Sequence, residues 1–324
     1  MAFWRCCLRE ARQPRGSSRR GGHFPELSKL NYLYSAMKRY IKALLGKAGL
    51  LERVQSSVLY DLYWRVVDRR LIDKRSREVG FYRDLLIGFQ ERDLIFDVGA
   101  NYGSKTDVFL RLGAKVVAVE PDESNQEILR RKFLHYRLSK KPVVVVGKAL
   151  SDRNAVETFW IDAPGSAMNT LSTKWVDSLR GGAERFGEKL GFGQKREVQT
   201  TTLEDLFATH GVPFFVKIDV EGFELNVLRG MKRPVPFLSF EVNLPEFRAE
   251  GLECIAALEG ISEGGLFNYA VDCQRGLSLD QWLGARDFKT LFMECKAAAV
   301  EVFWKTPPAR VETKQKTSDT FVHP

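Results

Sequence analysis

From residue 91 onward the chain alternates short, mainly apolar segments with turns and helical segments. The apolar segments cover residues 94–97, 115–120, 143–146, 214–219, 236–241 and 299–304. Nearly continuous apolar strands separated by helices are typical of a parallel sheet that is covered on both faces. We therefore predict a doubly wound α/β domain over residues 91–306, with a mostly parallel central sheet and a ligand at the carboxyl ends of the strands.

The net charge of +9 belongs to the N-terminal part of the chain. Residues 1–90 hold 19 Lys and Arg against 8 Asp and Glu, whereas the remaining residues hold 31 against 33. The predicted α/β domain is therefore nearly neutral, and its charge does not favour nucleic acid as a substrate.

Both ends of the chain lack the apolar content that a folded core requires. Residues 1–22 include six arginines and a single acidic residue. We expect residues 1–25 to be a disordered basic tail and residues 307–324 to be a disordered C-terminal tail.

Residues 26–90 are predicted to form a helical N-terminal extension. Apolar side chains recur there at three- and four-residue steps among lysines and arginines, at Leu30, Leu33, Met37, Ile41 and Leu44. That spacing indicates an amphipathic basic helix over residues 26–54. We favour a helix whose apolar stripe packs on the α/β domain, and weak contact with an anionic membrane surface is the alternative.

The alternating pattern is interrupted between residues 155 and 197. Residues 155–162 alternate like an additional strand. Residues 163–197 contain six glycines, and we interpret them as a mobile lid loop near the substrate. A loop of this length inside a compact domain is usually functional or disordered.

The number and spacing of the five cysteines bear on metal binding, on disulfides and on the compartment of the protein. Cys6, Cys7, Cys254, Cys273 and Cys295 show no C-x-x-C or Cys/His ligand spacing, which disfavours a zinc site. Their odd number in a chain of this size disfavours a disulfide framework and fits a reducing, cytoplasmic location. No apolar run approaches the roughly 18 residues that a membrane-spanning helix needs.

The segment from Asp97 to Thr106 reads D-V-G-A-N-Y-G-S-K-T, and three kinds of ligand compete for it. A dinucleotide site requires G-x-G-x-x-G and a later acid. Glu120 supplies the acid, but Asn101 stands where the second glycine belongs. A phosphate-binding loop requires G-x-x-x-x-G-K-[ST], and Ser104 takes the place of its second glycine. Asp97 would also put a carboxylate beside the phosphates.

The third candidate ligand is S-adenosylmethionine, which carries a sulfonium, an ammonium and a carboxylate but no phosphate. Asp97 would contact the ammonium, and Glu120 would accept hydrogen bonds from both ribose hydroxyls. Gly99 and Gly103 would let the backbone approach the ligand at a helix N-terminus, which suits the carboxylate. Asp152, after the third strand, would accept from the adenine amino group. Acids at successive strand ends suit a cation, so we prefer this ligand.

These segments resemble the FkbM-type S-adenosylmethionine-dependent methyltransferases. The resemblance rests on residues 94–103, 119–121, 149–152, 201–206, 217–222 and 228–230. The run K-I-D-V-E-G-F-E that begins at Lys217 is the most specific of these. The resemblance covers about residues 91–245 and implies a Rossmann-like fold and methyl transfer to a hydroxyl oxygen, often on a sugar or another natural product.

The resemblance also implies which residues bind the cofactor. They are Asp97, Gly99, Asn101, Gly103, Glu120 and Asp152. We add Ala100 and Ser151, which lie in the same segments.

A hydroxyl acceptor must lose its proton, so we expect a general base near the end of the fourth or fifth strand. Asp219, Glu221 and Glu241 are the candidates. Asp219 and Glu221 also precede a helix that either side chain would be suited to cap. A divalent metal between Asp219 and Glu241 is an alternative, but we expect no metal site.

The expected acceptor is a hydroxyl of a small molecule or glycan. Nucleic acid is disfavoured, because methyltransferases of base amino groups carry Asn/Asp-Pro-Pro-aromatic after the fourth strand. This chain has Asp219-Val220-Glu221-Gly222 there. Two other functions stay open at this point, a nucleotide-binding protein with a phosphate loop and a non-catalytic binding scaffold of the same fold. The oligomeric state is not predicted.

Overall fold

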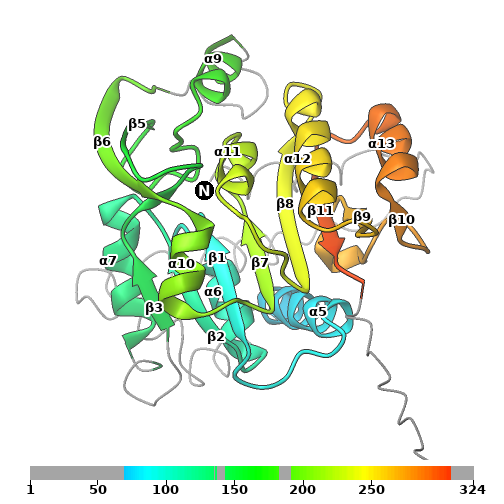
Figure 1. Ribbon diagram of the computed structural model, residues 1–324. Coiled ribbons are helices and arrows are strands. Elements are labelled where there is room, and N and C mark those ends of the chain that lie inside the picture. The colour runs from blue at the N-terminus through cyan, green and yellow to red at the C-terminus, as the bar shows by residue number, and fades with distance from the viewer. Residues whose placement is uncertain (1–68, 135, 137–142, 182–190, 308–324) are drawn as a thin grey trace, which may run out of the picture.

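The structure is a computed structural model that describes residues 69–134, 136, 143–181 and 191–307. Its centre is an eight-stranded sheet with the strand order β10-β9-β11-β8-β7-β1-β2-β3 (Figure 1). The five strands from β8 to β3 are parallel, whereas β11 pairs antiparallel with β8 and β9, and β10 pairs antiparallel with β9. The strands are β1 (Leu94–Val98), β2 (Lys115–Val119), β3 (Val143–Val146), β7 (Phe215–Ile218), β8 (Phe237–Asn243), β9 (Leu266–Ala270), β10 (Leu283–Gly284) and β11 (Ala299–Lys305). This order confirms the predicted doubly wound, mostly parallel α/β fold.

Helices cover both faces of the sheet, which explains why its central strands are apolar throughout. One apolar cluster includes Tyr82, Phe109 and Phe215 and lies between the sheet and α5, α6 and α7. The other includes Leu206 and Leu228 and lies on the opposite face. The helices are α5 (Arg69–Leu85), α6 (Ser104–Arg111), α7 (Glu123–Lys132), α10 (Leu203–His210), α11 (Glu224–Arg229), α12 (Arg248–Ile261) and α13 (Ala285–Glu294), with the 3-10 helix η1 (Cys273–Arg275).

The segment between β3 and α10 forms a small sheet of its own. It contains β4 (Ala149–Leu150), β5 (Val156–Ile161) and β6 (Gln194–Thr201), in the order β4-β6-β5. Strand β5 is the additional strand that the sequence predicts at residues 155–162, and it pairs antiparallel with β6. In Figure 1 this sheet stands above the carboxyl ends of the main strands.

The prediction of a continuous lid loop over residues 163–197 is wrong in part. Helix α9 (Thr173–Gly181) and the first residues of β6 lie inside this range. The helix forms because Trp175, Val176 and Leu179 share one buried face, while the hydroxyl of Ser172 accepts a hydrogen bond from the Trp175 amide. Of the described glycines in this range, Gly165 lies before the helix, Gly181 ends it, and Gly191 and Gly193 precede β6.

The predicted helix over residues 26–54 and the basic tail over 1–25 lie outside the described residues, as does nearly all of the tail over 307–324. The part of the N-terminal extension that is described includes α5, which packs on the main sheet. Its Tyr82 ring contacts the rings of Phe109 and Phe215, with centroids 5.0 and 5.8 Å away. Within the described ranges, no helix has both the length and the apolar character that crossing a membrane requires.

Candidate functional site

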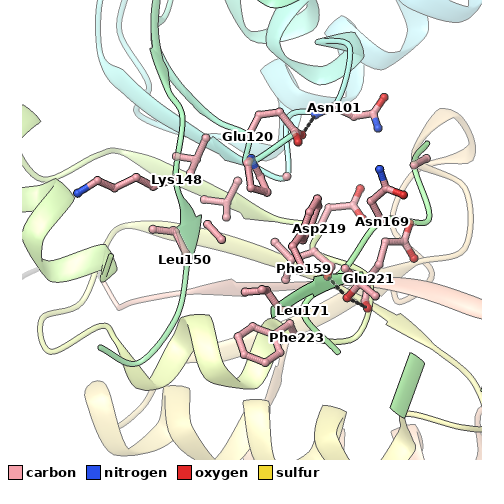
Figure 2. Close-up of a pocket in the computed structure, with 18 of the residues that line it drawn as sticks. Asn101, Glu120, Lys148, Leu150, Phe159, Asn169, Leu171, Asp219, Glu221 and Phe223 are labelled. Atoms are coloured by element: carbon pink, nitrogen blue, oxygen red, sulfur yellow. Dashed lines mark hydrogen bonds between the residues drawn. The ribbon is translucent and has the colours of Figure 1, made fainter. Parts of the chain in front are cut away.

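A cavity of about 660 Å³, including the part open to solvent, lies at the carboxyl ends of β1, β2 and β7 (Figure 2). The segment from β5 to α9 forms one wall, with Phe159, Asn169 and Thr170 among its lining residues. Of the residues predicted from the sequence, Gly99, Asn101, Glu120, Asp219 and Glu221 line this cavity.

Gly99 forms the turn after β1 in a conformation that side chains rarely adopt, with φ +78°. A Cβ atom there would lie 1.7 Å from the backbone oxygen of Asp219. Gly103 has φ +79°, and a Cβ atom there would lie 2.6 Å from side-chain atoms of Leu129 and Phe133. Both glycines are therefore required by contacts within the chain itself, in addition to any approach of a ligand.

Glu120 ends β2 with its two oxygens held by backbone amides. Its Oε1 accepts from the Asp122 amide at 2.8 Å, and its Oε2 accepts from the Asn101 amide at 2.7 Å. Burial raises the pKa of Glu120 to about 7, although both hydrogen bonds act in the opposite direction. Each carboxylate oxygen has a second lone pair, so Glu120 is able to accept from two neighbouring hydroxyls at the cavity wall.

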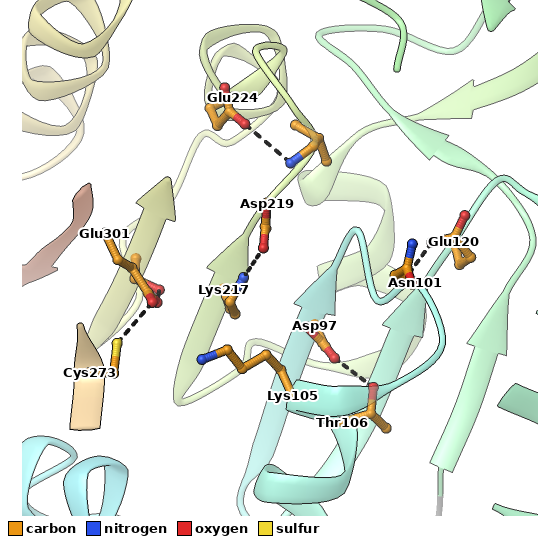
Figure 3. Close-up of polar contacts among 12 residues, drawn as sticks. Asp97, Asn101, Lys105, Thr106, Glu120, Lys217, Asp219, Glu224, Cys273 and Glu301 are labelled. Carbon is orange, nitrogen blue, oxygen red and sulfur yellow. Dashed lines mark hydrogen bonds and ion pairs between the residues drawn. The ribbon is translucent and has the colours of Figure 1, made fainter. Parts of the chain in front are cut away.

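Asp97 is buried in β1 and does not line the cavity. Its Oδ2 accepts a hydrogen bond from the Thr106 hydroxyl at 2.5 Å, and its strand neighbour on β7 is Lys217 (Figure 3). Burial raises the pKa of Asp97, and Lys217 and Thr106 oppose this shift. The structure therefore sets Asp97 beside the turn after β1, among the charges of β7.

Four other residues predicted to bind the cofactor are also absent from the cavity wall, Ala100, Gly103, Ser151 and Asp152. The Ser151 hydroxyl donates to Glu157 Oε1 at 2.9 Å, and Asp152 forms an ion pair with Arg153 at 3.3 Å. The wall next to them is made instead by Lys148, Ala149, Leu150 and Phe159. Sequence reasoning missed Phe159, although the alternation of residues 155–162 predicts that one face of this strand is buried.

The three candidate bases come together at the ends of β7 and β8. Asp219 accepts a hydrogen bond from the Lys217 ammonium at 2.7 Å through its Oδ2, and it is also hydrogen-bonded to Glu241. Burial acts to raise the pKa of Asp219, but Lys217 holds it below its ordinary value. The pKa of Glu241 is raised by burial and by the charge of Asp219.

Glu221 follows in the same turn and faces the cavity beside Asp219 (Figure 2). Burial raises its pKa well above the ordinary value, and the charges of Asp219 and Glu241 add to the shift. Within the described residues, no group of three or more His, Cys, Asp or Glu side chains is arranged to hold a metal ion.

Two lysines, Lys217 and Lys105, balance this acidic region, and sequence reasoning assigned no role to Lys217. Lys217 is almost fully buried, and its pKa is raised because Asp219, Glu301, Asp97 and Glu241 together outweigh the effect of burial. Its position inside an otherwise apolar strand is the signal that could have identified it.

Lys105 corrects the interpretation of the Gly99–Thr106 segment as a phosphate loop. A phosphate loop would direct this lysine toward the ligand. Lys105 instead forms an ion pair with Glu78 of α5 and lies 5.4 Å from the centre of the Tyr82 ring. Its side chain is only 25% exposed. Lys105 is absent from the cavity wall.

The comparisons with known proteins point to one family. The family described as the methyltransferase FkbM domain matches residues 97–272. None of the curated proteins matches this chain.

Several solved methyltransferase structures are similar in outline. A precorrin-6y C5,15-methyltransferase from Geobacter metallireducens has a TM-score of 0.37 at 8% identity, over 72% of this chain and 87% of its own. A putative RNA methyltransferase from Pyrococcus horikoshii has a TM-score of 0.35 at 12% identity, over 72% and 83%. An S-adenosylmethionine-dependent O-methyltransferase from Thermotoga maritima has a TM-score of 0.32 at 13% identity, over 71% and 65%.

Proposed function

This chain belongs to the FkbM methyltransferase family and uses S-adenosylmethionine as its methyl donor, and from this we propose that it methylates a hydroxyl oxygen of a small molecule or glycan. The observation that carries the proposal is the pair of carboxyls, Asp219 and Glu221, on the wall of the cavity at the end of β7. A hydroxyl acceptor needs a group that takes its proton, and these carboxyls supply candidates.

The residues of the cavity fit the methyl donor. Glu120 offers two oxygens for a pair of ribose hydroxyls, and Leu150 and Phe159 offer an apolar surface for an adenine ring. Asp219 and Glu221 suit the positive charge of the other end. When bound, S-adenosylmethionine supplies a methyl group on a positively charged sulfur.

Within this site we assign the general base to Glu221. A base works best when its pKa lies near the operating pH, and the raised pKa of Glu221 makes its ionised form more basic than an ordinary carboxylate. A cation in the cavity lowers that pKa, so the arrival of the donor favours the ionised form. Asp219 is the weaker base of the two, because Lys217 stabilises its negative charge.

Asp219 is then the group that stabilises positive charge in the cavity. It stays ionised because Lys217 donates to its Oδ2 at 2.7 Å, and it remains partly exposed toward the cavity. Glu241 is absent from the cavity wall, and it shares a hydrogen bond with Asp219. Its assigned role is to hold the Asp219 carboxylate in place.

The test is a screen of hydroxyl acceptors with radiolabelled S-adenosylmethionine, using glycans, natural-product polyols and phenols, with tRNA as a separate arm. We expect transfer to a hydroxyl compound, a loss of at least 100-fold in turnover for Glu221→Gln, and a smaller loss for Asp219→Asn and Glu241→Gln. Glu253→Gln is the matched control, because Glu253 lies in a surface ion pair with Arg229. Transfer to tRNA alone, or full turnover by Glu221→Gln, would contradict the proposal.

A further inference from the structure

The turn that carries Glu221 has an unfavourable backbone conformation. Glu221 has φ +54° and Gly222 has φ +86°. The left-handed region is readily adopted by glycine but is costly for a glutamate. Such a conformation persists only where surrounding contacts fix it. We therefore looked for the groups that hold residues 219–222.

The amide groups of the turn are held by Glu224, at the start of α11. Its Oε1 accepts from the Val220 amide at 3.1 Å and from the Gly222 amide at 3.2 Å. Glu224 is buried, and burial raises its pKa to about 7 against the effect of these hydrogen bonds. One carboxylate oxygen thus fixes the amides on both sides of Glu221.

The carbonyl groups of the same turn are held by Thr170 from the opposite side. The Thr170 hydroxyl donates to the Glu221 carbonyl at 2.8 Å and lies 3.3 Å from the Val220 carbonyl. The same oxygen accepts from the Ser172 amide at 2.9 Å. A hydroxyl has one hydrogen to donate, and this arrangement directs it at the turn.

Thr170 also belongs to a segment that reaches the other side of the cavity. Its neighbour Asn169 donates through Nδ2 to Asp122 Oδ2 at 2.8 Å. The Asp122 amide in turn donates to Glu120 Oε1 at 2.8 Å. Asn169 and Thr170 both line the cavity, and their hydrogen bonds link this segment to the Glu120 wall through Asp122 and to the Glu221 turn.

We propose that Thr170 and Glu224 are positioning residues that clamp the 219–222 turn and hold the Glu221 carboxyl toward the cavity. The inference rests on the proposed function in one respect, the role of Glu221. Neither residue transfers a proton to the substrate. They act through the backbone of the turn, one on its amides and the other on its carbonyls.

The experiment compares Thr170→Val, which removes the hydroxyl at nearly the same volume, with Thr170→Ser, which keeps it. Thr209→Val is the matched control, because the Thr209 hydroxyl donates to the Asp205 carbonyl at 2.8 Å on the exposed face of α10. Calorimetric titration with S-adenosylmethionine and with S-adenosylhomocysteine gives the affinities. Repeating the titrations at pH 7 in two buffers of different ionisation enthalpy gives the number of protons released.

In the wild type we expect S-adenosylmethionine to release more protons than S-adenosylhomocysteine, because only the first brings a sulfonium charge to Glu221. The charged groups that face Glu221 are Asp219, Glu241, Glu224 and Lys217, and none of them is changed in the Thr170 variants. Thr170→Val should weaken binding of S-adenosylmethionine by about 3- to 10-fold, as the loss of one hydrogen bond implies. It should also change the number of protons released.

Thr170→Ser and Thr209→Val should stay within about 2-fold of the wild type in both measurements. The inference is overturned if Thr170→Val matches the wild type, or if Thr170→Ser is as weak as Thr170→Val. If Thr170→Val does not fold, the pair Glu224→Gln and Glu224→Met replaces it. Glu224→Gln keeps the oxygen acceptor and should bind S-adenosylmethionine as the wild type does. Glu224→Met lacks the acceptor and should bind it more weakly.

These titrations need no methyl acceptor, so they separate the two proposals. Failure of every hydroxyl acceptor in the screen would overturn the proposed function and leave the clamp measurable. Unchanged affinity and proton release in Thr170→Val would overturn the clamp and leave the acceptor screen unaffected.

Discussion

Replacing Lys217 with methionine should destabilise the protein at pH 8 and do so by much less at pH 5. The Lys217 ammonium is 3% exposed and lies 2.7 Å from Asp219 Oδ2. Removing one partner of a buried ion pair costs about 3–5 kcal/mol, because the other charge stays buried without compensation. The Asp219 side chain is 28% exposed, so water compensates part of this cost. We therefore expect a loss of about 3 kcal/mol at pH 8.

The pH dependence follows from the pKa of Asp219. In the wild type Lys217 holds this pKa below its ordinary value. The ion pair therefore stabilises the fold above about pH 4, the ordinary pKa of an aspartate. This contribution is lost only as the pH falls through the pKa of the folded state. Without Lys217, burial moves the pKa of Asp219 upward. The carboxyl then takes up a proton more readily as the pH falls, which removes about 1.4 kcal/mol of the loss for each unit of pKa shift.

Urea denaturation at pH 5 and pH 8 measures both values. Adding Asp219→Asn to the Lys217→Met variant should recover part of the stability at pH 8, because the nearest of the negative charges that Lys217 compensates is then gone. Lys289→Met is the control, since the Lys289 ammonium donates to Glu259 at the surface and should contribute about 0–1 kcal/mol at either pH. An equal loss at both pH values, with no recovery in the double variant, would refute this account of Lys217.

Three further changes test other parts of the site. Gly99→Ala should lower the free energy of unfolding by about 2–5 kcal/mol in urea denaturation, because of its positive φ and the backbone contact of its Cβ atom. Gly276 has φ +91° and open space around it, so an equal loss in Gly276→Ala would contradict this prediction. Glu120→Gln should flatten the fall in the stability of the protein between pH 5 and pH 8. The reason is that a carboxyl whose folded pKa is raised to about 7 makes the folded state less stable as the pH rises toward that value. An unchanged slope would contradict the assigned pKa. Phe159→Ala should weaken S-adenosylhomocysteine binding about tenfold in calorimetry, and unchanged affinity would remove Phe159 from the adenine wall.

The central strands and their burial on both faces of the sheet could be predicted from the sequence, because they are nearly continuous apolar runs. Strands β1, β2 and β7 are short apolar runs that end in an acid or a glycine turn, and the structure places them side by side. Strands β9 and β10 could not be found in this way. The central residue of β9, Asn268, is polar and buried, and its side chain donates to the Leu279 carbonyl, a contact that no local pattern reveals.

The acids of the site were predicted by type, but their surroundings were not. A strand-end position does not tell whether a side chain points into the cavity or under the turn, and Asp97 and Glu120 differ in this respect. The effect of Lys217 on Asp219 is visible once both lie on the same face of β7. The ion pair of Lys105 with Glu78 joins residues 27 positions apart, and only the packing of α5 on α6 brings them together.

The contact between Gly99 and the Asp219 backbone has a consequence for protein engineering. In the proposed function the turn after β1 lies on the donor side of the cavity and the turn after β7 carries the base for the acceptor, and their main chains touch where a single methyl group would not fit. A chimera that imports a different β7 turn to change acceptor choice must therefore import the matching β1 turn with it. The two turns have to be exchanged together, although more than 100 residues separate them in the chain.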